Sequence, residues 1–251
     1  MIRRHPISAL AVLAVTLICS THAQQNPGIA TAGMSPVLAL LFKDFEAFSA
    51  TAEVTLSGPT AAESMTMTMH LHYLNGGMRT ELDMSDVRGP TVDESMAYTL
   101  KQIGMNRVIT ILQPDDRQNV VLYPSRKAYV SLPESSDQEK ARARSAQTRK
   151  TKQGQEIILG MTCTKSRISF VENPEQDLTV LVWEANRLRN FPVQIEMNQA
   201  GGAMTVRYRD VVFEAPAKDQ FEIPTGYRKH PGVQSILEEA TQELLKPLPK
   251  P

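Results

Sequence analysis

Sulfur and imidazole side chains gather in one short segment of the chain. Met65, Met67 and Met69 are followed by His70 and His72. Thioether and imidazole groups are ligands for copper, so the segment is a candidate metal site. In an extended strand, however, successive side chains point to opposite faces, which separates the methionines from the histidines. One ion cannot then reach both kinds of ligand, and we expect no metal and no cofactor.

The same methionines belong to a longer apolar alternation. Met65, Met67, Met69, Leu71 and Tyr73 alternate with polar residues, which is the pattern of a strand with one buried face. Methionine is unbranched and polarizable, so it adapts to flexible apolar partners. The pattern predicts either a packed core or the lining of a cavity, with the two histidines facing solvent.

Trp183, the only tryptophan of the chain, is a further candidate for contact with a ligand. An indole in an alternating strand can stack on an apolar ligand or pack in the core. The candidate cavity-lining residues are therefore Met65, Met67, Met69, Leu71, Tyr73 and Trp183.

The sequence shows no recognisable catalytic motif. His70, His72 and His230 are the histidines outside the N-terminal segment, and none lies in a G-x-S-x-G context. Cys-x-x-Cys pairs, His-Glu-x-x-His and phosphate-binding glycine loops are also absent from the sequence. We therefore expect a protein that is not an enzyme and has no catalytic residues.

The N-terminal segment has the features of a secretory signal peptide. Arg3 and Arg4 precede an apolar stretch from Ile7 to Cys19, which is shorter than the roughly 20 residues of a membrane-spanning helix. We expect cleavage after Ala23 and a periplasmic mature chain. Residues 1–23 would be the signal peptide and residues 24–251 a single domain. Lipid attachment at Cys19 is disfavoured because the preceding Ile18 is not small.

Charge and cysteine content narrow the function classes. Lysine and arginine number 27, as do aspartate and glutamate, so nothing indicates a nucleic-acid partner. Cys163 is the only cysteine after residue 23 and cannot form an internal disulfide. We expect it to be a small buried strand residue.

Most of the remaining sequence alternates in short runs, which predicts a mainly antiparallel sheet. Expected strands cover residues 52–56, 65–73, 78–84, 107–112, 118–123, 128–132, 156–170, 178–183, 191–197 and 204–213. Helical spacing predicts helices over Pro36 to Phe48 and over residues 232–245, the latter as a lid or cap on the sheet. Residues 133–152 are polar and become basic, which predicts a solvated helix or loop able to meet anionic lipid headgroups.

Five short motifs together resemble a known family. They are Gly77-Met78-Arg79-Thr80-Glu81, Tyr123-Pro124-Ser125-Arg126-Lys127-Ala128-Tyr129, Ile158-Leu159-Gly160-Met161-Thr162-Cys163-Thr164-Lys165, the stretch from Trp183 to Pro192, and Phe221-Glu222-Ile223-Pro224-Thr225-Gly226-Tyr227. Their order and spacing, over Phe45 to Tyr227, resemble exported bacterial proteins of unassigned function that are similar to the outer-membrane lipoprotein carriers of the Lol system.

The resemblance implies an α+β fold, mainly antiparallel β, in which an incomplete, strongly curved β-barrel has helices covering its concave face. It also implies a periplasmic binding or carrier module for a hydrophobic or acyl-bearing ligand or a lipoprotein, with transient contact to a membrane surface and no nucleic acid. The alternative is a structural or interaction protein whose curved sheet is filled by its own side chains. An enzyme or metal-binding protein is the third interpretation.

Overall fold

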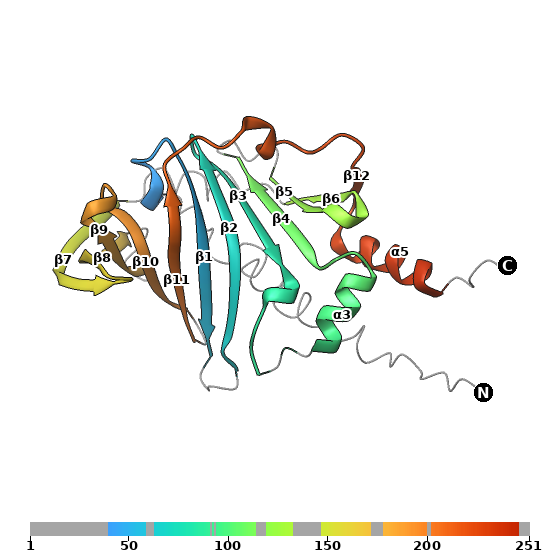
Figure 1. Ribbon diagram of the computed structural model, residues 1–251, viewed down its shortest axis with the longest axis horizontal. Coiled ribbons are helices and arrows are strands. Elements are labelled where there is room, and N and C mark those ends of the chain that lie inside the picture. The colour runs from blue at the N-terminus through green and yellow to red at the C-terminus, as the bar shows by residue number, and fades with distance from the viewer. Residues whose placement is uncertain are drawn as a thin grey trace.

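The computed structural model describes residues 40–58, 63–90, 92, 94–113, 119–132, 147–171, 178–199 and 202–245. Within these ranges the chain forms one 12-stranded sheet with two α-helices (Figure 1). The expected α+β, mainly antiparallel architecture is therefore confirmed. The strands are β1 (Ala47–Ser57), β2 (Met65–Leu74), β3 (Gly77–Asp83), β4 (Arg107–Leu112), β5 (Val120–Tyr123), β6 (Ala128–Ser131), β7 (Gln147–Ile158), β8 (Met161–Val171), β9 (Leu178–Ala185), β10 (Phe191–Gln199), β11 (Gly202–Val212) and β12 (Arg228–His230).

Two meanders meet at the centre of the sheet. The spatial order is β12-β6-β5-β4-β3-β2-β1-β11-β10-β9-β8-β7, and the pairing of β1 with β11 joins the two halves of the chain. Every ladder is antiparallel except the short one between β12 and β6. Strands distant in sequence thus become neighbours at the middle of the sheet.

The prediction of a strongly curved, incomplete barrel is wrong. The sheet is open and is not strongly curled. Closure into a barrel needs tilted, staggered strands and repeated bulges. Register shifts interrupt the described ladders only between Ser49 and Thr51, between Lys152 and Gly154, and between Pro192 and Gln194. Strands β7 and β12 remain the two edges of the sheet.

Two hairpin turns use left-handed backbone. Asn75 and Gly76 have φ of 49° and 87°, which is the type I′ geometry that the Asn-Gly pair predicts. Leu159 and Gly160 have φ of 50° and 71° and form a second turn of this kind. That turn divides the expected continuous strand over residues 156–170 into β7 and β8.

Three further expectations about local structure need correction. The helix expected over Pro36 to Phe48 is absent from its described part: η1 (Leu40–Phe42) is a 3₁₀ turn, and β1 begins at Ala47. The solvated helix or loop expected over residues 133–152 is a strand from Gln147 onward, and residues 133–146 lie outside the described residues. Helix α3 (Glu94–Gln102) was not expected.

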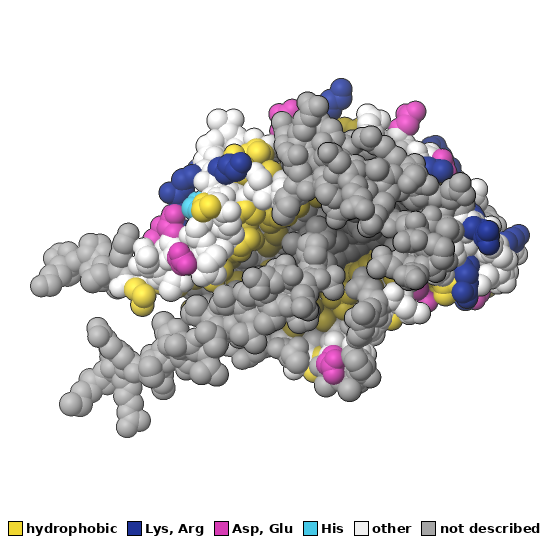
Figure 2. Space-filling view, turned by 180° about the vertical axis from the view of Figure 1, so that it is seen from behind, with side chains coloured by type: hydrophobic (Ala, Val, Ile, Leu, Met, Phe, Trp, Pro, Cys, Tyr) yellow, Lys and Arg dark blue, Asp and Glu magenta, His cyan; other side chains and the backbone are white. Residues whose placement is uncertain are grey.

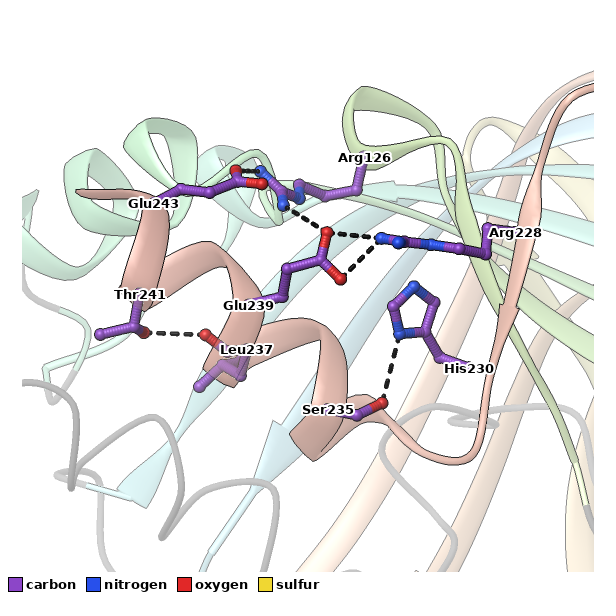
Figure 3. A network of polar contacts seen from close by, with 8 residues as sticks. All are labelled: Arg126, Arg228, His230, Ser235, Leu237, Glu239, Thr241 and Glu243. Atoms are coloured by element: carbon purple, nitrogen blue, oxygen red, sulfur yellow. Dashed lines mark hydrogen bonds and ion pairs between the residues drawn. The ribbon is translucent and has the colours of Figure 1, made fainter. Parts of the chain in front are cut away.

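The C-terminal helix is confirmed as α5 (Val233–Leu245). Its buried residues Ile236, Leu237 and Ala240 pack with Leu100 of α3 and Val121 of β5 in one apolar cluster. A polar network also ties the helix to the sheet edge (Figure 3). In that network Arg126 contacts Glu243 at 2.6 Å, and Arg228 of β12 contacts Glu239 at 2.6 Å. Both helices therefore cover the β4–β6 end of the sheet.

We name the two faces of the sheet by their residues on β2. The methionine face carries Met67, which pairs with Val54 of β1, and the histidine face carries His70, which pairs with Thr51. The α3 and α5 cluster lies on the methionine face. At the same end of the sheet, Phe221 and neighbouring residues cover Ile111 and Leu122 on the histidine face. The segment that carries Phe221 also contains η6 (Lys218–Phe221) and runs from β11 to β12.

Candidate functional site

The alternation of β2 places its apolar residues on the methionine face. Met67, Met69, Leu71 and Tyr73 are buried, and Met65 is partly buried against the same cluster. His70 is exposed on the opposite face. The structure thus brings the five β2 candidates together on one surface, and their role as cavity lining stays a prediction.

Methionines form a row at one end of this face. Met65 of β2 pairs with Leu56 of β1, Leu56 pairs with Met204 of β11, and Met204 pairs with Met197 of β10. The next row toward the aromatic end is branched and aliphatic, with Val54 and Val206 beside Met67. The face is therefore apolar without interruption across four strands. Seen from behind, the molecule is hollowed, and hydrophobic side chains line the visible part of the hollow (Figure 2).

An aromatic cluster occupies the other end of the same strands. Phe191 is fully buried, and its ring centroid lies 4.9 Å from that of Phe48 and 5.3 Å from that of Phe45. Phe48 stacks on Tyr73 at 5.1 Å, and Phe191 meets Tyr208 edge-on at 5.7 Å. Edge-to-face and offset geometries at these distances are favourable for aromatic rings. One end of the face is thus built from interlocked rings.

Trp183 is not brought to this surface. The residue before it, Val182, pairs with Ile195 of the methionine face, so Trp183 lies on the histidine face. Its Nε1 donates to Glu156 Oε2 at 2.8 Å, and Lys165 Nζ lies 4.7 Å from the ring centroid. The buried indole therefore contacts charged groups of β7 and β8 on the face opposite to the β2 candidates, although it belongs to the same buried apolar cluster.

The histidine face offers no metal cluster. Among the described residues, no group of three or more His, Cys, Asp or Glu side chains is placed to hold an ion. His72 Nδ1 instead lies 2.9 Å from Ser49 Oγ. Burial, and then the positive charge of Arg79, hold the pKa of His72 below its ordinary value. His72 is thus a neutral partner of Ser49 at neutral pH.

Burial also perturbs groups at the aromatic end. It raises the pKa of Tyr208 far above its ordinary value, and it raises that of Tyr73 as well. Cys163 is fully buried in β8, as expected, and burial raises the pKa of its thiol. A buried thiol with a raised pKa is a poor nucleophile. These groups therefore act in the structure as neutral, packed side chains.

A pocket of about 540 Å³ opens beside the aromatic cluster, with which it shares Tyr208. It lies between the β7–β8 turn, η5 (Asn186–Leu188) and β11. Its lining residues are Leu159, Met161, Arg187, Leu188, Tyr208, Arg209, Asp210 and Val211. Sequence reasoning did not identify this pocket, because its walls come from three segments far apart in the chain.

The structure is similar to solved structures of the LolA superfamily and related lipoproteins, as the sequence motifs predicted. It is similar to the lipoprotein LppX of Mycobacterium tuberculosis, with a TM-score of 0.41 and 14% identity over 74% of this chain and 96% of that chain. It is also similar to a LolA superfamily protein of Nitrosomonas europaea, with a TM-score of 0.37 and 12% identity over 76% and 97% of the two chains.

A third similar structure is a chain of the MucA/MucB complex of Pseudomonas aeruginosa, with a TM-score of 0.38 and 12% identity over 74% of this chain and 59% of that chain. No protein-family model and no curated protein matches the sequence. No helix among the described residues is long and apolar enough to cross a membrane. Function is therefore inferred from the residues of this chain.

Proposed function

We propose that this protein is a periplasmic binding or carrier module for a hydrophobic, lipid-like molecule or a lipid-bearing partner. It would hold its ligand by burial of apolar surface, without covalent chemistry. Residues 1–23, the expected signal peptide, lie outside the described residues. The intact mass of the protein purified from the periplasm tests this export. A mass equal to that of a chain starting at Gln24 would support it, and the mass of a chain that retains Cys19 with an attached lipid would contradict it.

The observation that carries the proposal is the uninterrupted apolar surface of the methionine face. It crosses β2, β1, β11 and β10, while the apolar cluster that contains α3 and α5 is confined to the β4–β6 end. At one end of this surface, Met65, Met204 and Met197 form a row with Leu56. Unbranched thioether side chains adjust to acyl chains of different shape at little cost in strain.

One observation favours the alternative function, a structural protein with a self-filled sheet. The buried residues of the methionine face are at most 8% exposed, and Val54 is fully buried. A surface already packed at interior density would have no room for a ligand. The carrier function predicts that a methionine of this face borders a space, and the structural function predicts that it is tightly packed.

The discriminating experiment compares Met67→Ala with Met105→Ala. Met105 is a buried methionine in the cluster of α3 and α5, so it matches Met67 in residue type and burial. Both variants would be measured by thermal denaturation and by titration with a fluorescent fatty acid. We expect Met105→Ala to cost the ~2–5 kcal/mol typical of a packed core and to leave fatty-acid binding unchanged.

For Met67→Ala we expect a destabilisation below about 2 kcal/mol, because the truncation enlarges an existing space, together with weaker fatty-acid binding. A loss of stability equal to that of Met105→Ala, in a protein that never bound the probe, would establish the self-filled sheet instead. Stoichiometric copper bound through both Met67 and His70 would contradict the separation of the two faces.

A further inference from the structure

The pocket beside η5 combines an apolar floor with a charged rim. Met161 and Tyr208 are buried and Leu188 is partly buried, while Leu159 is 42% exposed at the mouth. Its volume of about 540 Å³ lies within the usual range for small-ligand sites. The floor therefore suits an apolar chain, and the rim decides which polar group can accompany that chain.

Two of the three charged groups at the rim form no ion pair among the described residues. Arg209 Nη2 lies 2.9 Å from Glu53 Oε2, so its charge is compensated. Arg187 and Asp210 are exposed, and neither belongs to an ion pair between described residues. The rim thus presents one cation and one anion to whatever occupies the pocket.

The backbone fixes where these two charges stand. Arg187 lies in the 3₁₀ turn that joins β9 to β10. Asp210 has a φ of 53°, at the point where β11 shifts register against Ser49 and Thr51 of β1. Left-handed backbone is unfavourable for most residues, although aspartate and asparagine tolerate it. The carboxylate is therefore presented by a bulge and not by a regular strand position.

We propose that this pocket binds a single-chain zwitterionic amphiphile. Its anionic group pairs with Arg187, its ammonium group pairs with Asp210, and the first part of its chain lies on Met161, Leu188 and Tyr208. A purely anionic amphiphile would gain from Arg187 but would be repelled by Asp210. The inference rests on the proposed function and deepens it by naming the headgroup class of the ligand.

The test uses two lysophospholipids of equal chain length, below their critical micelle concentrations. Lysophosphatidylethanolamine carries phosphate and ammonium, and lysophosphatidylglycerol carries phosphate alone. Calorimetric titration of the purified protein should show about threefold tighter binding of the ethanolamine lipid, the size expected for a partly exposed ion pair. Asp210→Asn, which the left-handed backbone tolerates, should abolish this preference.

Arg187→Gln should weaken the binding of both lipids by about threefold, because both carry the phosphate. Arg167→Gln is the matched control, since Arg167 is an exposed arginine of β8 outside the pocket lining. It should change neither affinity. Thermal denaturation of each variant identifies any that fails to fold. Arg187→Lys retains the positive charge and should bind both lipids about as tightly as the unaltered protein.

Three results would overturn the inference: no preference in the unaltered protein, a preference that survives Asp210→Asn, or an equal effect of Arg167→Gln. If the fluorescent fatty acid binds and Met67→Ala weakens it while Arg187→Gln changes nothing, the inference fails and the proposed function stands. If neither lysophospholipid nor the fatty acid binds, both fail.

Discussion

The two ends of the methionine face are built from different kinds of side chain. At one end Phe48, Tyr73, Phe191 and Tyr208 interlock, with ring centroids 4.9 to 5.7 Å apart among the directly contacting pairs. At the other end Met65, Met204 and Met197 line up across the strands. Rings have few rotamers, whereas methionine has three rotatable bonds. The aromatic end should therefore fix the sheet, and the methionine end should be able to change shape.

The largest effect is expected at the aromatic end. Phe191→Ala removes a fully buried ring that meets Phe42, Phe45, Phe48 and Tyr208. Loss of a phenylalanine from a packed core costs ~3–5 kcal/mol. Denaturant unfolding would measure this, and Phe191→Leu should recover part of the loss. A cost below about 1 kcal/mol would mean that the rings are loosely packed and that the contrast between the two ends is false.

A smaller effect is expected in the methionine row. Met204→Leu conserves volume and should cost less than about 1.5 kcal/mol. The branched leucine side chain is less adaptable than methionine. The variant should therefore bind a narrower range of fatty-acid chain lengths than the unaltered protein does. Competition of a chain-length series against the fluorescent fatty acid measures this. An unchanged range in a stable variant would show that methionine flexibility has no part in binding.

The same contrast explains which structural features the sequence predicted. Strand β2 was predicted correctly because polar and apolar residues alternate without a break from Met65 to Tyr73. The wrong N-terminal helix was predicted from apolar residues at helical spacing, which are Val37, Leu40, Leu41, Phe45 and Phe48. In the structure the rings of Phe45 and Phe48 meet at 6.1 Å because the chain turns between η1 and β1. Tertiary packing of aromatic rings thus overrode the local periodicity.

The candidate site was only partly predictable for a similar reason. Trp183 was expected in an alternating strand, but Val180, Leu181, Val182 and Trp183 are all apolar. Period 2 therefore gave no indication of which face would receive the indole. The β7–β8 turn was missed because Leu159 adopts left-handed backbone, where asparagine or glycine is expected. Since that turn supplies one wall of the pocket, the pocket could not be predicted either.

Cys163 offers an intermediate test close to the aromatic end. It pairs with Ala185, which in turn pairs with Phe191, and its Sγ lies 3.4 Å from the carbonyl oxygen of Met161. Cys163→Ser places a hydroxyl in this buried position and should cost on the order of 1–2 kcal/mol. Chemical denaturation measures the cost. Oligomers that form under oxidising conditions only in the unaltered protein would instead indicate an intermolecular disulfide.

The smallest expected effect is a change of stability with pH. It tests the side of the aromatic end that lies on the histidine face. His72 lies on the histidine face directly behind the contact between Phe48 and Tyr73, where it pairs with Ser49. Its pKa is lowered in the folded protein, mainly by burial and then by Arg79. The unfolded chain therefore binds a proton at a pH where the folded chain does not. Stability should be highest above the unfolded pKa of about 6.5 and should decline as the pH falls below it.

His70 provides the matched control for this pH dependence. It is on the same face and strand but is exposed and lies behind Met69 and Leu71, nearer the methionine row. The free energy of unfolding would be measured from pH 7.5 to about 5.5, above the range in which carboxylates such as Glu81 titrate. His72→Asn should flatten the decline, since the group that takes up the proton on unfolding is gone, whereas His70→Asn should leave it unchanged. If the free energy of unfolding depends on pH equally in the two variants, neutral His72 does not stabilise the aromatic end. The rings alone would then account for its rigidity.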